Sequence, residues 1–194
     1  MKAIFQLKFL IYPLLLLFFV VGCKNEPKTD NSTVSEVTND TEANKEKGQA
    51  FIEDDGSTPN VLQIAIGSPD HTTLVAAVQA ANLENALVNA GPLMVFAPTN
   101  AAFDALPAGT VENLLKPENK DALANILKHH VTAGNYSKDF LKRFKKLGQA
   151  NDQNTTIEVK GDDVYVGGAK IIASVPAGNG IVHVVDKVIL PPSE

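Results

Sequence analysis

The sequence is poor in cysteine and has no tryptophan: Cys23 is the only thiol among 194 residues. One cysteine cannot form a disulfide within the chain, so no cross-link is available to hold the fold together. Apolar residues make up 44% of the sequence, which is an ordinary share for a globular protein. The fold must therefore be stabilised by a hydrophobic core.

Motifs of the common enzyme classes are also absent. The sequence has no Gly-x-Ser-x-Gly turn, and it has no cysteine apart from Cys23 that could act as a nucleophile. Gly167-Gly168 and Gly178-Asn179-Gly180 match no phosphate-binding or dinucleotide-binding loop. We therefore expect no enzyme activity, no catalytic residue and no cofactor.

Metal sites are poorly supported as well. His129 and His130 are adjacent, so their side chains diverge on a helix and cannot readily share a metal ion. Asp162-Asp163 lies at the tip of an expected hairpin, where a pair of carboxylates is more often solvated than bound to calcium. We expect no metal site.

Residues 1–22 are predicted to be a lipoprotein signal peptide. Lys2 and Lys8 lie near the start, and an apolar run extends from Phe9 to Val21. A membrane-spanning helix needs roughly 20 apolar residues, so this run is short for one, and an uncleaved anchor is the alternative interpretation. The segment from Val20 to Cys23 resembles the lipobox of bacterial lipoproteins, which implies that Cys23 is acylated.

Residues 23–58 are expected to form a lipidated cysteine followed by a disordered acidic tether. From Lys24 to Thr58 the chain has nine acidic residues and four lysines, a net charge of −5, and almost no aromatic residues. Such a segment cannot bury enough apolar surface to offset the entropy of ordering. A coil of this length spans roughly 30–35 Å, enough to hold a domain away from a membrane surface.

Residues 59–192 are expected to form one α+β domain, because helical spacing dominates its first half and strand alternation its second. Helices are predicted over 60–66, 73–80, 83–88, 100–106, 110–115, 119–130 and 137–144, and strands over 93–97, 155–160, 164–166, 170–175 and 181–190. Residues 59–194 carry eleven basic and thirteen acidic residues, so the charge of this region does not favour nucleic acid as a partner.

A cluster of cations is the candidate binding site. Five basic residues fall within nine positions: Lys138, Lys142, Arg143, Lys145 and Lys146. Phe140, Leu141 and Phe144 are expected to turn inward and leave these cations in solvent. The cluster predicts a site for anionic glycans or for the acidic surface of a partner; a merely solubilising helix face is the alternative.

Three segments, in order, resemble the fasciclin domain family: residues 93–103, His130-Val131 with Gly134 and Tyr136, and residues 179–186. The resemblance covers about Pro59 to Pro191. It implies a wedge-like β-sandwich of about seven strands with helices packed along one side. We interpret the following motif residues as structural: Phe96, Pro98, Thr99, Asn100, Phe103, His130, Tyr136, Asn179, Gly180, His183 and Asp186.

The family resemblance also implies a function, namely adhesion to cells, matrix or surface glycans and proteins. Together with the expected lipid anchor, it predicts an extracytoplasmic adhesion module. The lysine after Cys23 does not match the aspartate signal that retains some lipoproteins at the inner membrane, which favours the bacterial outer membrane. The alternative is a periplasm-facing factor for ligand binding or envelope assembly.

Overall fold

A computed structural model of the chain describes residues 58–89 and 91–192, all of which belong to one structural unit. The expected signal peptide, Cys23 and nearly all of the expected tether lie outside these residues. The described helices are α1 (Val61–Ile66), α2 (Thr72–Ala80), α3 (Glu84–Asn89), α4 (Asn100–Asp104), α5 (Thr110–Leu114), α6 (Lys120–Lys128) and α7 (Lys138–Leu141), with short 3-10 turns η2 (Pro69–His71) and η3 (Pro117–Asn119). Each of these helices is too short to cross a bilayer as an apolar span.

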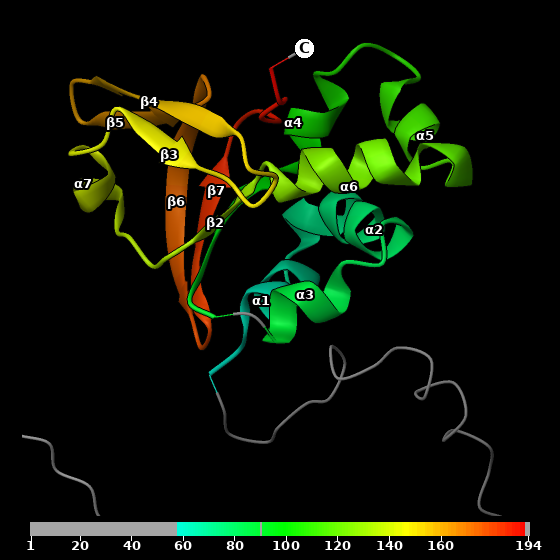
Figure 1. The fold of residues 1–194 in the computed structure, drawn as a ribbon, viewed down its shortest axis with the longest axis horizontal. Helices are drawn as coiled ribbons and strands as arrows, with labels where there is room; N and C mark the ends of the chain where they lie inside the picture. Colours follow the sequence, from blue (N-terminus) through cyan, green and yellow to red (C-terminus); the bar gives the residue numbers. More distant parts are fainter. Residues whose placement is uncertain (1–57, 90, 193–194) are drawn as a thin grey trace, which may run out of the picture. The chain divides into compact units, whose positions relative to one another are not determined.

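The strands of the described region form one seven-stranded sheet in the order β2-β1-β7-β6-β5-β4-β3. They are β1 (Leu93–Pro98), β2 (Val131–Ala133), β3 (Lys146–Gly148), β4 (Asn154–Lys160), β5 (Asp163–Val166), β6 (Ala169–Ala177) and β7 (Gly180–Val185). β1 and β7 are parallel, whereas every other neighbouring pair is antiparallel. Helices α1 to α6 gather on one side of the sheet, and α7 lies apart from them beside the strands (Figure 1). The α+β class and the seven-stranded architecture predicted from the sequence are confirmed.

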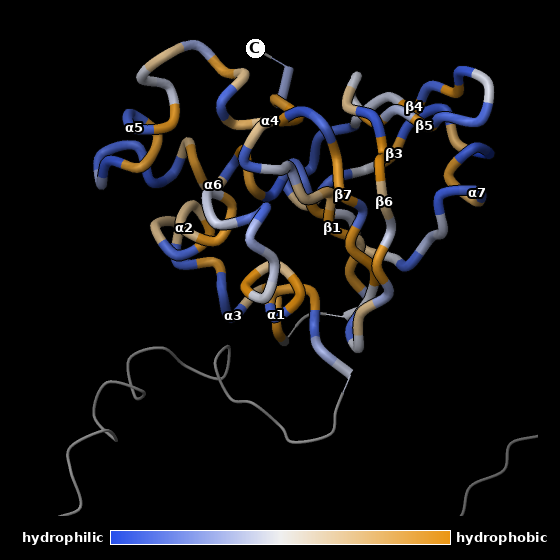
Figure 2. Tube along the Cα trace, turned by 180° about the vertical axis from the view of Figure 1, so that it is seen from behind, coloured by the Kyte–Doolittle hydropathy of each residue, from blue (hydrophilic) through white to orange (hydrophobic). Residues whose placement is uncertain are grey.

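Strand β1 separates two hydrophobic cores. Leu93, Val95 and Ala97 contribute to the core shared with the helices, while Met94 and Phe96 contribute to the core enclosed by the strands. All six residues of β1 are buried, so the strand needs apolar side chains on both faces and not only on alternate ones. This accounts for its continuous apolar run, which Figure 2 shows as an orange stretch at the centre of the molecule.

Two predicted elements end well before their expected last residue. The helix expected over 137–144 is only the single turn α7, which ends at Leu141. The strand expected over 181–190 ends at Val185, because the carboxylate of Asp186 accepts a hydrogen bond of 2.7 Å from the backbone N–H of Lys170. A side chain that bonds to the backbone in this way competes with continuation of the strand ladder.

Two strands, β2 and β3, are not predicted by the sequence pattern. Each has only three residues, too few for strand alternation to be recognised. β2 follows directly after the end of α6, and β3 begins inside the run of basic residues. Their pairing partners, β1 and β4, decide that these segments are strands.

Candidate functional site

The three sequence motifs meet at the paired strands β1 and β7. The parallel register places Phe96 opposite His183, and their rings stack with centroids 5.7 Å apart. The backbone N–H of Phe96 donates to the carbonyl of His130 at 2.8 Å. Residues far apart in the sequence thus form one continuous structural unit.

His183 is fully buried and both of its ring nitrogens are occupied. Nε2 lies 2.9 Å from the carbonyl oxygen of Tyr136, which can only accept, so Nε2 carries the proton. Nδ1 then accepts from the hydroxyl of Ser174 at 2.7 Å. Burial lowers the pKa of His183, and the Tyr136 carbonyl opposes this only in part. The contact resembles two members of a catalytic triad, but a main-chain carbonyl takes the place of the acid, and the ring cannot reach a substrate.

His130 is also a satisfied core residue. Its Nδ1 donates to the carbonyl of Ile126 at 2.8 Å, and its Nε2 accepts from the backbone N–H of Ile189 at 2.9 Å. Burial lowers the pKa of His130 to about 4, although the Ile126 carbonyl raises it slightly. The ring is therefore neutral near physiological pH and has no free nitrogen for a metal ion.

Thr99 and Asn100 have different structural roles. Thr99 is the N-cap of α4, and its hydroxyl accepts from the N–H of Ala102 at 3.3 Å. The side chain of Asn100 instead accepts from the N–H of Thr73 at 3.0 Å and donates to the carbonyl of Pro69 at 2.9 Å. It therefore ties α4 to the start of α2.

Asn179 and Gly180 connect the turn before β7 to the helices. The side chain of Asn179 accepts from the N–H of Val61 at 2.9 Å and donates to the carbonyl of Leu87 at 2.7 Å. A side chain at Gly180 would overlap the backbone carbonyl of Leu93. The Asn-Gly pair is therefore required by close backbone packing and by polar contacts with α1 and α3.

The other motif residues also have structural surroundings. Pro98 and Phe103 are buried, and Asp186 bonds to the backbone of the neighbouring strand β6. The ring of Tyr136 covers Gly134, where a Cβ atom would lie 2.8 Å from the ring. Among residues 58–89 and 91–192, no three His, Cys, Asp or Glu side chains come together as a metal site would require.

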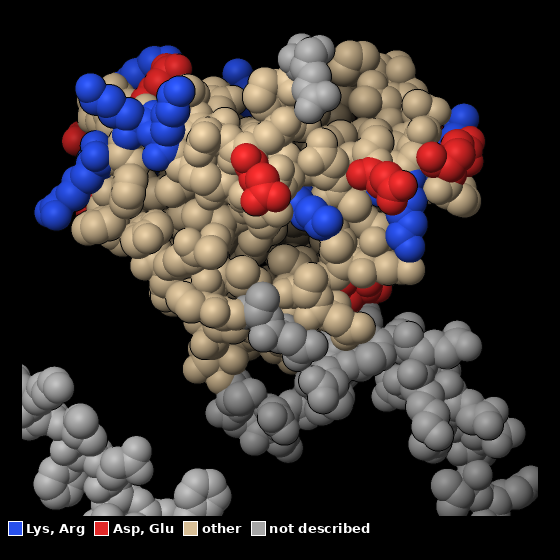
Figure 3. Space-filling model, viewed as in Figure 1, with Lys and Arg blue, Asp and Glu red and all other residues tan. Residues whose placement is uncertain are grey.

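The predicted basic residues do lie on one surface, at α7 and the start of β3. Lys142, Arg143, Lys145 and Lys146 are exposed, and Lys138 is half-buried. Figure 3 shows lysine and arginine side chains gathered on this part of the molecule, while they are scattered elsewhere on the same face. We call Lys138, Lys142, Arg143, Lys145 and Lys146 the α7–β3 surface.

Acidic neighbours neutralise part of this surface. Lys142 pairs with Asp139 at 2.8 Å, which raises the pKa of Lys142 and lowers that of Asp139. Lys138 lies 4.0 Å from Asp163, whose shorter ion pair is with Lys170 at 2.7 Å. These two lysines are less available to an external anion than their position in the sequence suggests.

The remaining three cations face solvent and pair with no carboxylate in the described part of the chain. Lys145 and Lys146 form no ion pair with any described residue, and Arg143 lies 5.1 Å from the centre of the Phe140 ring in a cation–π contact. Arg143 on the Phe140 ring, next to Lys145 and Lys146, can bind an anionic partner through its charge and through stacking of its planar guanidinium.

Three aromatic side chains form a cluster beside the basic residues of this surface. The rings of Tyr136, Phe140 and Phe144 contact one another with centroids 5.3 to 5.5 Å apart. Leu141 is fully buried, but Phe140 is 39% exposed, so the expectation that Phe140 turns inward is wrong. Phe140 lies within α7, whereas Phe144 follows the end of the helix and is half-buried. The four-residue spacing of the three rings was the available signal for this cluster.

Comparisons with known proteins agree with this geometry. Residues 69–191 match the family model described as "Fasciclin domain". The chain is 48% identical over 137 residues to "Protein sll1483" of Synechocystis sp., covering 70% of this chain and 76% of that protein. It is 36% identical over 140 residues to "Cell surface glycolipoprotein MPB83" of Mycobacterium bovis, covering 69% of this chain and 61% of the relative.

The fold is shared with solved structures. An example is a fasciclin domain pair from the insect cell adhesion molecule fasciclin I, with a TM-score of 0.60 and 17% sequence identity. The similarity covers 70% of this chain and 52% of that chain, so this protein spans about half the length of the domain pair. At this level of identity the likeness concerns the fold alone.

Proposed function

The chain belongs to the fasciclin domain family, and we propose on that basis that it is an extracytoplasmic adhesion module anchored by a lipid at Cys23. Relatives in this family are cell-surface and adhesion proteins: the mycobacterial relative is named a cell surface glycolipoprotein, and the structural neighbour is a cell adhesion molecule. In this proposal the acidic segment 24–58 holds the domain away from the bacterial outer membrane.

The observation that supports a binding role most directly is the α7–β3 surface. Its unpaired cations, Lys145 and Lys146, lie beside an arginine that is held on the exposed ring of Phe140. We propose that this surface binds anionic glycans or acidic protein surfaces. The affinity of each site is low, and many anchored copies on one cell strengthen attachment.

A binding role also agrees with the state of the ionisable groups. All four histidines are buried, and the lowered pKa values of His71, His130 and His183 favour their neutral forms. The Ser174–His183 contact resembles part of a catalytic triad, but the second ring nitrogen of His183 bonds to the carbonyl of Tyr136 and not to a carboxylate. We propose that the protein works by binding and not by catalysis.

A matched pair of charge reversals tests the binding surface. We expect the double variant Lys145→Glu/Lys146→Glu to weaken attachment of the full chain to immobilised heparin by roughly tenfold, with a weaker dependence on salt. Lys116→Glu/Lys187→Glu is the control, because these two exposed lysines change the net charge equally at distant sequence positions and form no ion pair with described residues. Equal binding by both variants would contradict the proposal.

Protease treatment of intact cells tests the orientation. Adhesion requires that the domain be degraded on intact cells, with the same sensitivity as in lysed cells. Protection of the domain until lysis would favour the alternative of a periplasm-facing ligand-binding or envelope-assembly factor.

A further inference from the structure

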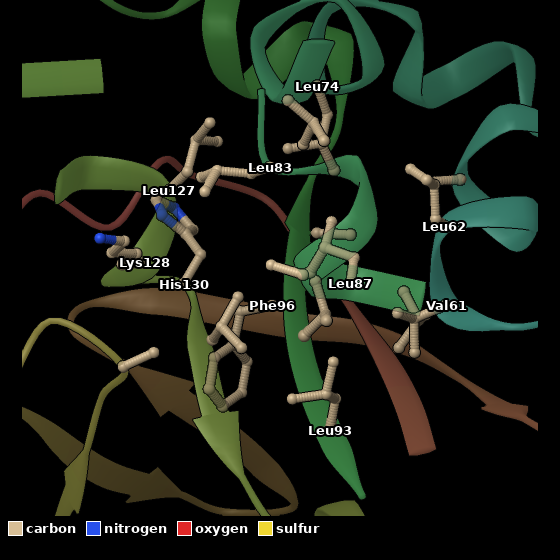
Figure 4. Close-up of a pocket in the computed structure, with 18 of the residues that line it drawn as sticks. Val61, Leu62, Leu74, Leu83, Leu87, Leu93, Phe96, Leu127, Lys128 and His130 are labelled. Atoms are coloured by element: carbon tan, nitrogen blue, oxygen red, sulfur yellow. The ribbon is translucent and has the colours of Figure 1, made fainter. Parts of the chain in front are cut away.

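An apolar cavity lies in the helix-side core, away from the α7–β3 surface. Its volume is about 220 Å³, and side chains of α1, α2, α3, β1 and α6 surround it (Figure 4). Val61, Leu87 and Leu93 face one part of it, and Leu127 and His130 border another. Figure 3 shows the corresponding face of the molecule hollowed below α6.

A cavity of this size is unusual in a protein interior. Cores pack about as densely as organic crystals, and few of their voids exceed one water molecule. Water gains little here, because the lining is nearly all aliphatic and offers almost no hydrogen-bonding partner. An apolar cavity of about 150 Å³ holds a benzene molecule, so this one can hold roughly nine carbon atoms.

The cavity reaches solvent at a rim that carries one cation. Ala86 of α3 and Ala150, which precedes β4, both line the cavity and are exposed. Lys128, at the end of α6, is the one charged side chain among the lining residues, and it forms no ion pair with any described residue. Figure 4 shows it beside His130 at one side of the cavity.

His130 cannot supply the polar contact that a ligand would need. Both of its ring nitrogens are already bonded, to the carbonyl of Ile126 and to the N–H of Ile189. The ammonium group of Lys128 is therefore the available polar group, and it selects a negatively charged head. An aliphatic interior with a single cation at its rim is complementary to an amphiphile with one acyl chain and one carboxylate.

We propose that this cavity is a binding site for a medium-chain fatty acid, with the acyl chain among the leucines and the carboxylate on Lys128. The site is separate from the α7–β3 surface, so it does not depend on the proposed function. Burial of the chain supplies the affinity, since each methylene removed from water strengthens binding about fourfold. The carboxylate fixes the direction in which the chain enters.

Photolabelling of the full chain in native membranes tests the site. The probe is a ten-carbon fatty acid with a diazirine near the end of its chain, and mass spectrometry of the digested protein locates the adducts. We expect adducts on residues that line the cavity, such as Leu74 and Val78 of α2. Adducts spread evenly over the domain surface would overturn the proposal.

Tryptophan substitutions at the rim provide the matched comparison. Ala86→Trp and Ala150→Trp each place a large ring at the cavity from a different side, and we expect at least about fivefold less labelling for each. Ala76→Trp is the control, because Ala76 is an exposed helical alanine that does not line the cavity. Circular dichroism shows whether each variant is folded. Two folded rim variants that label as strongly as the Ala76 variant would overturn the proposal.

Charge reversal at Lys128 tests the head group. We expect Lys128→Glu to reduce labelling by the carboxylate probe about tenfold and to leave labelling by the corresponding alcohol within about twofold. Lys116→Glu, another exposed lysine that does not line the cavity, should change neither. Equal losses for the acid and the alcohol would overturn the assignment of Lys128 to the carboxylate.

Discussion

Moderate acid should destabilise the folded domain, and His130 should account for a large part of the effect. Its ring is fully buried, and burial lowers its pKa from the ordinary value of 6.5 to about 4. The unfolded chain binds a proton at this position more readily than the folded protein does. The stabilising contribution is therefore fully present above the unfolded pKa and is lost as the pH falls through the folded pKa.

The size of the effect follows from the two pKa values. Between about pH 7.5 and about pH 5, a histidine with these values lowers the free energy of unfolding by about 2 kcal/mol. Burial also lowers the pKa of His71 and His183, so these residues add to the loss in the same direction. The shifted carboxylates Asp139 and Asp163 have pKa values below 3.8 and titrate outside this window.

Urea unfolding followed by circular dichroism at the two pH values measures this change. Repeating the titrations at high salt is the control, because salt screens exposed charges but leaves the cost of charging a buried ring largely unchanged. Nitrogen NMR of the histidine rings gives the residue-specific test: folded His130 should stay neutral at about pH 5, with its proton on Nδ1. A charged His130 ring in the folded protein, or equal stability at both pH values, would refute the reasoning.

Substitutions in the structural motifs should separate buried contacts from surface ones. Asn179→Ala removes the side-chain partner of two backbone groups, the N–H of Val61 and the carbonyl of Leu87, and should lower the free energy of unfolding by about 2 kcal/mol. Asn135→Ala is the control: its side chain forms no hydrogen bond with described residues, so it should lower that free energy by less than about 0.5 kcal/mol. Gly180→Ala should cost more than about 3 kcal/mol, because its new Cβ overlaps a backbone carbonyl; a thermal melt close to that of the parent would show that the backbone can shift. Measured by urea unfolding, Phe96→Ala should lower the free energy of unfolding by about 3–5 kcal/mol, and Phe140→Ala, at a partly exposed ring, by far less. Equal losses would contradict the assignment of Phe96 to the core and of Phe140 to the surface.

Much of the secondary structure could be predicted from local pattern. The continuous apolar run over 93–97 predicted the strand β1, and the helical spacing over 119–130 predicted the helix α6. The helices and strands of more than a few residues were all anticipated, because each carries enough positions to show its period. β2 and β3 were missed, since three residues show no period.

The candidate site was only partly predictable. The basic run was visible, but which cations remain available depends on acids brought in by the fold: Asp163 of β5 lies near Lys138, whereas Lys145 and Lys146 have no such neighbour. The exposure of Phe140 was predicted wrongly, and α7 is shorter than the pattern suggested.

By itself, the sequence determined the fold class, the buried strand over residues 93–97, and the family, because these depend on periodicity and on ordered motifs that are written in consecutive residues. The tertiary structure alone decided what those motifs contact. Asn179 bonds to Val61, 118 positions earlier in the chain, and Asn100 bonds to Thr73 of α2, 27 positions earlier. The apolar cavity beneath α6 likewise arises only where helices and strands from separate parts of the chain pack together without filling the space between them, which no local pattern encodes.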